Sequence, residues 1–171
     1  SAASTLHTSG SSDQAVTIQT TTAGADSRIN FRNSSGTDAG GIHYKHNGNH
    51  LTFHTGGSLA ERVRIDSSGR VGIGTTSPSE LLHIAGATNP AITLQDTTNN
   101  TDARIKTNNN GDLVFEADYN NEQSDSRIGF ETDGSEKVRI DSSGNVGIGT
   151  TSPNHKLTLA TTSTNTFDAL N

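Results

Sequence analysis

The stretch that decides the fold is Val63-Arg64-Ile65-Asp66-Ser67-Ser68-Gly69-Arg70-Val71-Gly72-Ile73-Gly74-Thr75-Thr76-Ser77-Pro78, which returns at residues 138–153. The two copies differ at one of sixteen positions, where Asn145 replaces Arg70. Near-identity of this length within one chain indicates a repeated structural unit. The positions that we assign to the repeat scaffold are Val63, Ile65, Asp66, Gly69, Val71, Gly72, Ile73, Gly74, Pro78, Val138, Ile140, Asp141, Gly144, Val146, Gly147, Ile148, Gly149 and Pro153.

Each copy predicts a short hairpin. Val63 and Ile65 alternate with charged residues, which is the period of a half-buried strand. Asp66-Ser67-Ser68-Gly69 is turn chemistry, because Asp and Ser bond the local backbone and Gly accepts a positive φ. Gly72 and Gly74 leave one face bare, as do Gly147 and Gly149 in the second copy, so we expect neighbouring chains to approach closely there.

The repeat divides the chain into modules. Leu6-His7-Thr8, Leu82-His83-Ile84 and Leu157-Thr158-Leu159 occupy equivalent positions. We therefore expect a first β-module at residues 1–81, a second at 82–156 and the start of a third at 157–171. A third start close to Asn171 suggests that the natural protein continues beyond it.

Composition argues against an ordinary globular domain. Apolar residues make up 28 % of the chain, whereas globular proteins contain about 45–50 %. Disorder is the simplest interpretation of such a composition, but the net charge is only −6 and the apolar residues alternate strictly. The pattern instead predicts an all-β fold of short hairpins and loops, thin as a monomer, that gains its core from partner chains.

Several classes of function are disfavoured. The chain has no Cys, so it offers no disulfide framework and no thiolate ligand or nucleophile. It contains no apolar run long enough to span a bilayer, so we expect no membrane insertion. It is acidic and lacks a Lys/Arg cluster, which disfavours nucleic acid as a partner.

In the first module we expect strands near 15–20, 27–32, 41–46, 50–55, 62–66 and 70–74. Asn47-Gly48 predicts a type I′ hairpin turn, with positive φ at both residues. That turn sets Tyr44 opposite Leu51 and Ile42 opposite Phe53, all on one apolar face that we expect to point inward. Ser77-Pro78-Ser79-Glu80 fits a capping box and predicts one short helical turn, almost the only helix in the chain. We also expect structural ion pairs across strands, of Arg62, Arg64, Lys137 and Arg139 with Glu61, Asp66, Glu136 and Asp141.

The motif at residues 63–78 and 138–153, followed by Leu82-His83-Ile84, resembles the repeats of bacteriophage tail fibre and tailspike proteins. The likeness includes Ser126-Arg127-Ile128-Gly129-Phe130-Glu131 and the Asn47-Gly48 hairpin. It implies an elongated homotrimeric fibre, an intertwined triple β-helix or a β-prism, with the chains interlocked or side by side. It further implies a virion protein, exposed outside the cell, that joins other tail proteins to a host-surface polysaccharide or protein receptor. Many such fibres end in a cleaved chaperone domain, which we do not find before Asn171.

Four histidines of the first module, His43, His46, His50 and His54, are candidate ligands for a transition metal. Three chains could bring such groups together on a common axis. The alternation favours a different interpretation, in which His43, His50 and His54 point outward on a solvated face. In that interpretation His43 and His50 contact glycans.

The polar loop from Asp118 to Asp125 is the second candidate site. Its oxygen ligands Asp118, Asn120, Glu122 and Asp125 could hold Ca²⁺, although the loop lacks the Gly and the terminal Glu of an EF-hand. A plain solvated loop is the alternative, so we expect no resident cofactor. Tyr119 is an amphipathic ring that can stack on a sugar.

We expect no enzymatic activity. Glycoside hydrolysis needs two carboxylates about 5–9.5 Å apart, and Asp66 and Asp141 are repeated turn positions. Gly72-Ile73-Gly74 lacks the third Gly of a dinucleotide fingerprint. The expected function is therefore a structural and receptor-binding segment of a trimeric phage tail fibre. The alternatives are a non-viral adhesin or extracellular filament, and the non-catalytic stalk of a polysaccharide-degrading tailspike.

Overall fold

The computed structural model describes residues 16–160 of the 171, and within this range the chain is all-β, with thirteen strands in three open sheets and no helix. It divides into two compact units, residues 1–86 and 87–171. The Leu82–Ile84 strand, which we expected to open the second module, pairs inside the first unit. No helix within residues 16–160 is long and apolar enough to cross a membrane.

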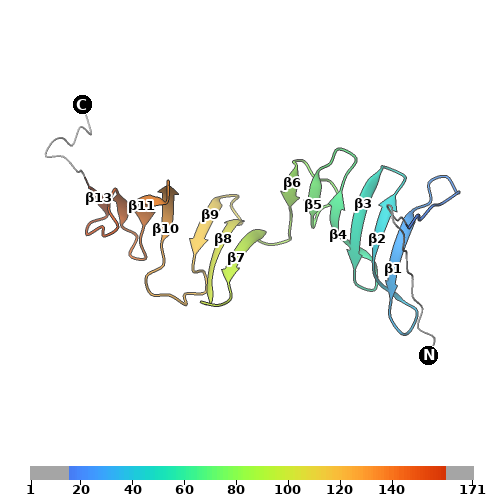
Figure 1. Ribbon diagram of the computed structural model, residues 1–171, viewed down its shortest axis with the longest axis horizontal. Coiled ribbons are helices and arrows are strands. Elements are labelled where there is room, and N and C mark those ends of the chain that lie inside the picture. The colour runs from blue at the N-terminus through green and yellow to red at the C-terminus, as the bar shows by residue number, and fades with distance from the viewer. Residues whose placement is uncertain (1–15, 161–171) are drawn as a thin grey trace, which may run out of the picture. The chain divides into compact units, whose positions relative to one another are not determined.

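The first unit is a single six-stranded sheet whose strands follow in chain order (Figure 1). Each strand pairs with the next in antiparallel fashion, except that the last two are parallel. The strands are β1 (Ser27–Arg32), β2 (Asp38–Lys45), β3 (His50–Thr55), β4 (Ala60–Ile65), β5 (Val71–Ile73) and β6 (Leu82–Ile84).

The β2–β3 hairpin has the predicted register. Tyr44 pairs with Leu51 and Ile42 with Phe53. The predicted type I′ turn is wrong, because the connection is a four-residue loop at 46–49 with positive φ at Gly48 (100°) and Asn49 (48°). The loop is centred on the Asn47-Gly48 bond, as the two-residue turn would be, and for that reason the pairing is unchanged.

One five-residue loop recurs in the chain, and the Asp66 turn predicted from the repeat is an example of it. The Asp66 carboxylate accepts hydrogen bonds from the backbone N–H of Ser68 and Arg70, both at 2.9 Å, while Gly69 takes a φ of 78°. Asn or Asp in first place and Gly in fourth place are common to all copies, which span residues 33–37, 66–70, 108–112 and 141–145.

The predicted helical turn at Ser77–Glu80 is wrong, because this segment carries the chain across from β5 to the parallel strand β6. Ser77 N–H donates to the Thr75 hydroxyl at 3.1 Å, and Ser79 N–H donates to His83 Nδ1 at 3.3 Å. These hydrogen bonds hold the segment in its crossover conformation, in place of the hydrogen bonds of a helical turn.

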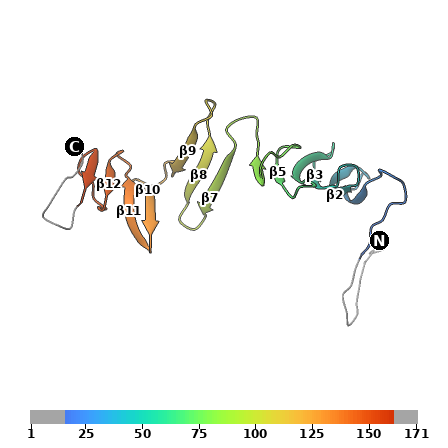
Figure 2. The ribbon, with the colours of Figure 1, turned by 90° about the horizontal axis from the view of Figure 1, so that it is seen from above.

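The second unit repeats these strands but divides them between two sheets. The order is β7-β8-β9 in one sheet and β10-β11-β12-β13 in the other, with β12 and β13 parallel (Figure 2). Strands β9 and β10 correspond to the paired β2 and β3 but do not pair with each other. The bounds are β7 (Ala91–Asp96), β8 (Thr101–Thr107), β9 (Leu113–Ala117), β10 (Ile128–Thr132), β11 (Ser135–Ile140), β12 (Val146–Ile148) and β13 (Leu157–Leu159).

The strand predicted at 15–20 is absent from residues 16–20, and Ala15 lies outside the described residues. The equivalent segment of the second unit does form β7. There Asp96 closes the turn to β8 by accepting hydrogen bonds from the backbone N–H groups of Thr98 and Asn99. Its counterpart Thr20 accepts one only from Thr22, so the first unit has a weaker turn at this place.

Candidate functional site

The largest feature of the first unit is an uncovered apolar sheet face. One row across the six strands runs Ile29, Ile42, Phe53, Val63, Ile73 and Ile84, and its neighbour runs Tyr44, Leu51, Ile65, Val71 and Leu82. Phe53 is 37 % exposed although it lies in the interior of the sheet, and Leu82 is 54 % exposed. We call these two rows the apolar face.

The second unit presents the same kind of surface. Phe130, Val138, Ile148 and Leu159 form one row, and Ile128, Ile140, Val146 and Leu157 form the next. In the other sheet the row is Ile92, Ile105 and Phe115. No apolar residue of the described range is buried. A folded sheet whose apolar side is only half-buried lacks a core of its own, because burial of that side is what stabilises a sheet.

The polar face of the first unit is the buried one, which corrects the predicted orientation. His43 is 2 % exposed and His54 is 8 % exposed, and Thr52 between them is fully buried. The predicted outward positions of His43 and His54 are therefore wrong, and His43 is not available as a glycan contact. The cause is Gly41, where a Cβ would lie 2.7 Å from His43 Nε2, so the missing side chain makes room for the imidazole.

The two imidazoles lie in a closed hydrogen-bond network. Their ring centroids are 4.4 Å apart. His43 Nε2 lies 2.9 Å from Asn30 Oδ1, and His54 Nε2 lies 2.7 Å from Thr52 Oγ1. His54 Nδ1–H donates to the Leu59 carbonyl oxygen at 2.6 Å. Burial lowers the pKa of His43, and the nearby His54, Arg28 and Lys45 lower it further.

The four histidines are thus not brought together as one ligand set. His46 lies at the hairpin loop, where its Nε2 is 3.0 Å from the Ser27 hydroxyl and its ring contacts Tyr44. His50 is half-buried opposite Lys45. Residues 16–160 contain no cluster of three or more His, Asp or Glu arranged to hold a metal ion.

The Asp118 loop is held by two carboxylates. Asp118 accepts hydrogen bonds from the backbone N–H of Glu122 and Gln123, both at 2.9 Å. Asp102, which is 8 % exposed, accepts from Tyr119 N–H at 3.1 Å and from Asn120 Nδ2 at 2.8 Å. Two of the four predicted Ca²⁺ ligands, Asp118 and Asn120, therefore serve to shape the loop.

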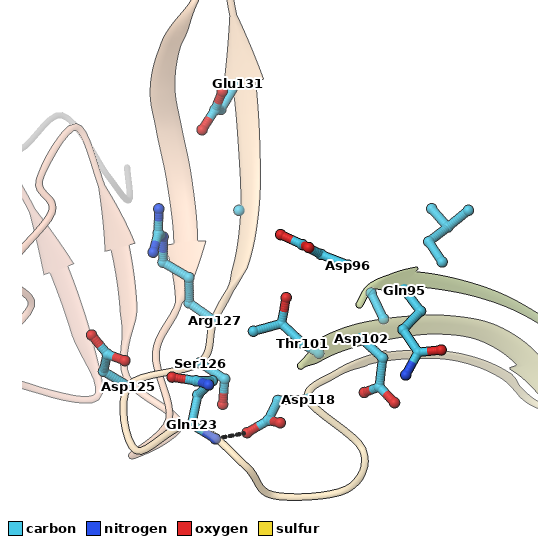
Figure 3. A pocket seen from close by; sticks show the side chains of 14 residues that line it. Gln95, Asp96, Thr101, Asp102, Asp118, Gln123, Asp125, Ser126, Arg127 and Glu131 are labelled. Carbon is cyan, nitrogen blue, oxygen red and sulfur yellow. Dashed lines mark hydrogen bonds between the residues drawn. The ribbon is translucent and has the colours of Figure 1, made fainter. Parts of the chain in front are cut away.

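Beside this loop lies a pocket of about 610 Å³ in the second unit. Asp96, Thr101, Arg127 and Glu131 lie around it, and Figure 3 shows the Asp118–Gln123 hydrogen bond at its lower rim. The lining also contains Asp102, Asp118 and Asp125, so the pocket is acidic with one guanidinium. Tyr119, 45 % exposed, has the Arg104 guanidinium 3.3 Å from its ring centre, a cation–π contact that covers one face of the ring.

The repeated glycines have a reason within their own chain. A Cβ at Gly72 would lie 2.7 Å from the Thr75 carbonyl oxygen, and one at Gly74 would lie 2.2 Å from that of Ala85. Gly147 and Gly149 meet Thr150 and Ala160 in the same way, at 2.7 and 3.0 Å. The bare face that we assigned to contact between chains is therefore occupied by the chain's own backbone, in the crossing that follows β5 or β12 and directly after β6 or β13.

Two of the predicted ion pairs form at the repeat, but within one strand and not across strands as predicted. The Arg64 guanidinium donates two hydrogen bonds to Glu61, at 2.6 and 2.9 Å. Arg139 and Glu136 form the same pair in the second unit, and Arg127 joins Glu136 at 2.9 Å. Burial pushes the pKa of Glu61 upward, but the hydrogen bonds and charge of Arg64, together with the nearby His50 and His54, outweigh it and hold that pKa below its usual value.

Three structural residues were not predicted from the sequence, namely Asp102, Asn33 and Asn108. Asp102 is embedded in a charged stretch of β8, and nothing in its spacing links it to the 118–125 loop. Asn33 and Asn108 could have been found, because Asn-x-x-Gly repeats the Asp-x-x-Gly pattern of the predicted turn.

In comparisons with known proteins, no family model and no curated protein matches the chain.

Proposed function

We propose that this chain is a structural segment of a homotrimeric bacteriophage tail fibre, whose copies cover one another's apolar faces. The observation that supports the proposal most strongly is the combination of in-register apolar rows with the absence of any buried apolar residue in the described range. Contiguous exposed apolar surface of this extent is characteristic of an interface. The repeat motif resembles tail fibre repeats, and this resemblance is the basis for proposing that class of protein.

Within that fibre the sheets act as a scaffold, and the loops are free to contact a host-surface glycan or protein receptor. The Asp118 loop and Tyr119 are the candidate contact, because the ring is 45 % exposed and stacked on Arg104. A preformed aromatic ring with polar neighbours suits a sugar, whose faces are apolar and whose edges carry hydroxyl groups. We propose no catalytic role and no resident cofactor.

The purified protein tests both parts of the proposal. Light scattering should give three times the chain mass of 17.8 kDa, and a glycan array should show binding that is lost in Tyr119→Ala and kept in Tyr119→Phe, which retains the aromatic ring. A trimer that binds no glycan would reduce the segment to a spacer. A binding protein that proves to be a monomer would refute the fibre.

The adhesin alternative differs in location only. Immunogold labelling with an antibody against this chain separates the two. Label on virion tails supports the fibre, whereas label confined to cell surfaces supports the adhesin or filament.

A further inference from the structure

The second unit has an opening where the first unit has a strand pair. Strands β2 and β3 pair along their whole length, whereas their counterparts β9 and β10 end separate sheets, each with an unpaired edge. An apolar pocket of about 260 Å³ lies beside these strands, lined by Ile92, Ile105, Phe115 and Ile128 among others. Unpaired edges flanked by apolar side chains are sites for pairing with another strand.

The chain's own β10 does not pair with the β9 edge, although it begins at Ile128, beside the same pocket as Phe115 of β9. The free edge of β9 is the one opposite β8. The loop that follows β9 runs the other way, because Asp118 N–H donates to the Asp102 carbonyl oxygen at 2.7 Å and the Asp102 carboxylate accepts from Tyr119 and Asn120. Gln123 Nε2 then donates to the Asn99 carbonyl oxygen, in the turn between β7 and β8, at 3.5 Å.

We propose that the free edge of β9 pairs with β10 of a neighbouring copy of this chain, so that the second unit is completed by strand exchange. This inference rests on the self-association proposed above. The two units then differ in kind, since the β2–β3 pair closes within one chain and the β9–β10 pair joins two.

The register of the exchanged pair follows from the first unit. Ile105 pairs with Phe115 as Ile29 does with Ile42, and Phe130 pairs with Val138 as Phe53 does with Val63. The Ile42–Phe53 pair therefore becomes Phe115 opposite Phe130 of the neighbour, and the next position sets Ala117 opposite Ile128.

Charge agrees with this register. It places Asp118 of one copy opposite Arg127 of the next, and Arg127 is 46 % exposed in the single chain. In the two apolar pairs and in the Asp118–Arg127 pair, side chains of matching character face each other, and no like charges lie directly opposite one another. The same register sets Val114 opposite Glu131, which is an exposed residue outside every ion pair of the described range.

Cysteine cross-linking tests the exchange, because the chain contains no Cys of its own. Directly opposed residues of an antiparallel pair have Cα atoms about 4.5–5.5 Å apart, within reach of a disulfide. Chains carrying Val114→Cys and differently tagged chains carrying Glu131→Cys are co-expressed, oxidised and run on a non-reducing denaturing gel. We expect a covalent dimer that contains both tags, and a covalent trimer from the double variant. The matched control is Lys45→Cys with His50→Cys, which should form only a disulfide within one chain.

The outcomes separate the two proposals. A trimer by light scattering whose double variant carries only disulfides within single chains, or none, overturns the exchange and leaves the fibre intact. A monomer overturns both. If Val114→Cys or Glu131→Cys prevents folding, as judged by circular dichroism, differently tagged chains that carry either Ala117→Cys or Ile128→Cys test the same register, and we expect a covalent dimer that contains both tags.

Discussion

Replacing Phe53 by Ala tests whether the apolar face is covered by other copies. Phe53 pairs with Ile42 on β2 and with Val63 on β4, in the interior of the six-stranded sheet. Nothing in the single chain covers the 37 % of Phe53 that stays exposed. If copies of the chain associate through this face, that fraction becomes buried, and its loss in the variant weakens association.

The size of the effect follows from the exposed fraction. Burying a whole Phe side chain contributes about 1.5–3 kcal/mol, so covering the 37 % that is exposed contributes about 0.6–1.1 kcal/mol per chain. Three chains give about 2–3 kcal/mol. At about 1.4 kcal/mol per tenfold change, the overall association constant of the trimer should fall roughly 30- to 140-fold.

Sedimentation equilibrium over a dilution series measures this change directly. Phe53→Leu is the matched control, because it keeps an apolar side chain of similar size and should associate nearly as the wild type does. Equal association constants for wild type and Phe53→Ala would refute the argument, since they would mean that Phe53 stays in water in the assembled protein.

Three further predictions concern single residues. Burial lowers the pKa of His43 in the folded chain. The contribution of neutral His43 to stability should therefore be complete above about pH 6.5 and be lost as the pH falls toward the folded pKa. Thermal melts between pH 7.5 and 5 should show a melting temperature that falls with pH, and an equal fall in His43→Gln would contradict the prediction. Gly74→Ala should lower the free energy of unfolding by about 1–3 kcal/mol from backbone strain alone, because φ is +73° and the new Cβ would lie 2.2 Å from the Ala85 oxygen. Denaturant titration measures this beside the control Gly57→Ala, which meets nothing within 4 Å. Equal midpoints for the two variants would count against the positive φ of Gly74 and its close approach to Ala85. Asp66→Asn should fold nearly as well as wild type, because Asn33 and Asn108 hold the same five-residue loop elsewhere in the chain. Asp66→Ala should melt several degrees lower. Identical melting temperatures of all three proteins would show that the side-chain hydrogen bonds of the loop contribute nothing to stability.

The sequence was a good guide to strand pairing. Alternation in residues 41–55 and the Asn47-Gly48 centre determine the β2–β3 register, because a hairpin's register depends on where its turn is centred and not on the turn's type. The same argument applies to Asp66 and Asp141, where side chain and glycine both act within a few residues. Local chemistry of this kind can be recognised from spacing alone.

The burial of the histidine side of the first sheet was predicted wrongly, for a non-local reason. We expected the apolar side to point inward and the histidines to point outward into solvent. In the single chain His43 folds over Gly41 and is buried, while Phe53 on the other side remains exposed. Likewise the separation of β9 from β10 depends on Asp102, whose contacts lie some sixteen residues further along the chain. Periodicity contains no information about either.

The mass of the protein in solution tests the central claim most directly. Multi-angle light scattering at micromolar concentration should give three times the chain mass of 17.8 kDa, because one chain alone leaves its apolar rows in water. A mass of one chain, with native β-sheet content by circular dichroism, would contradict the account.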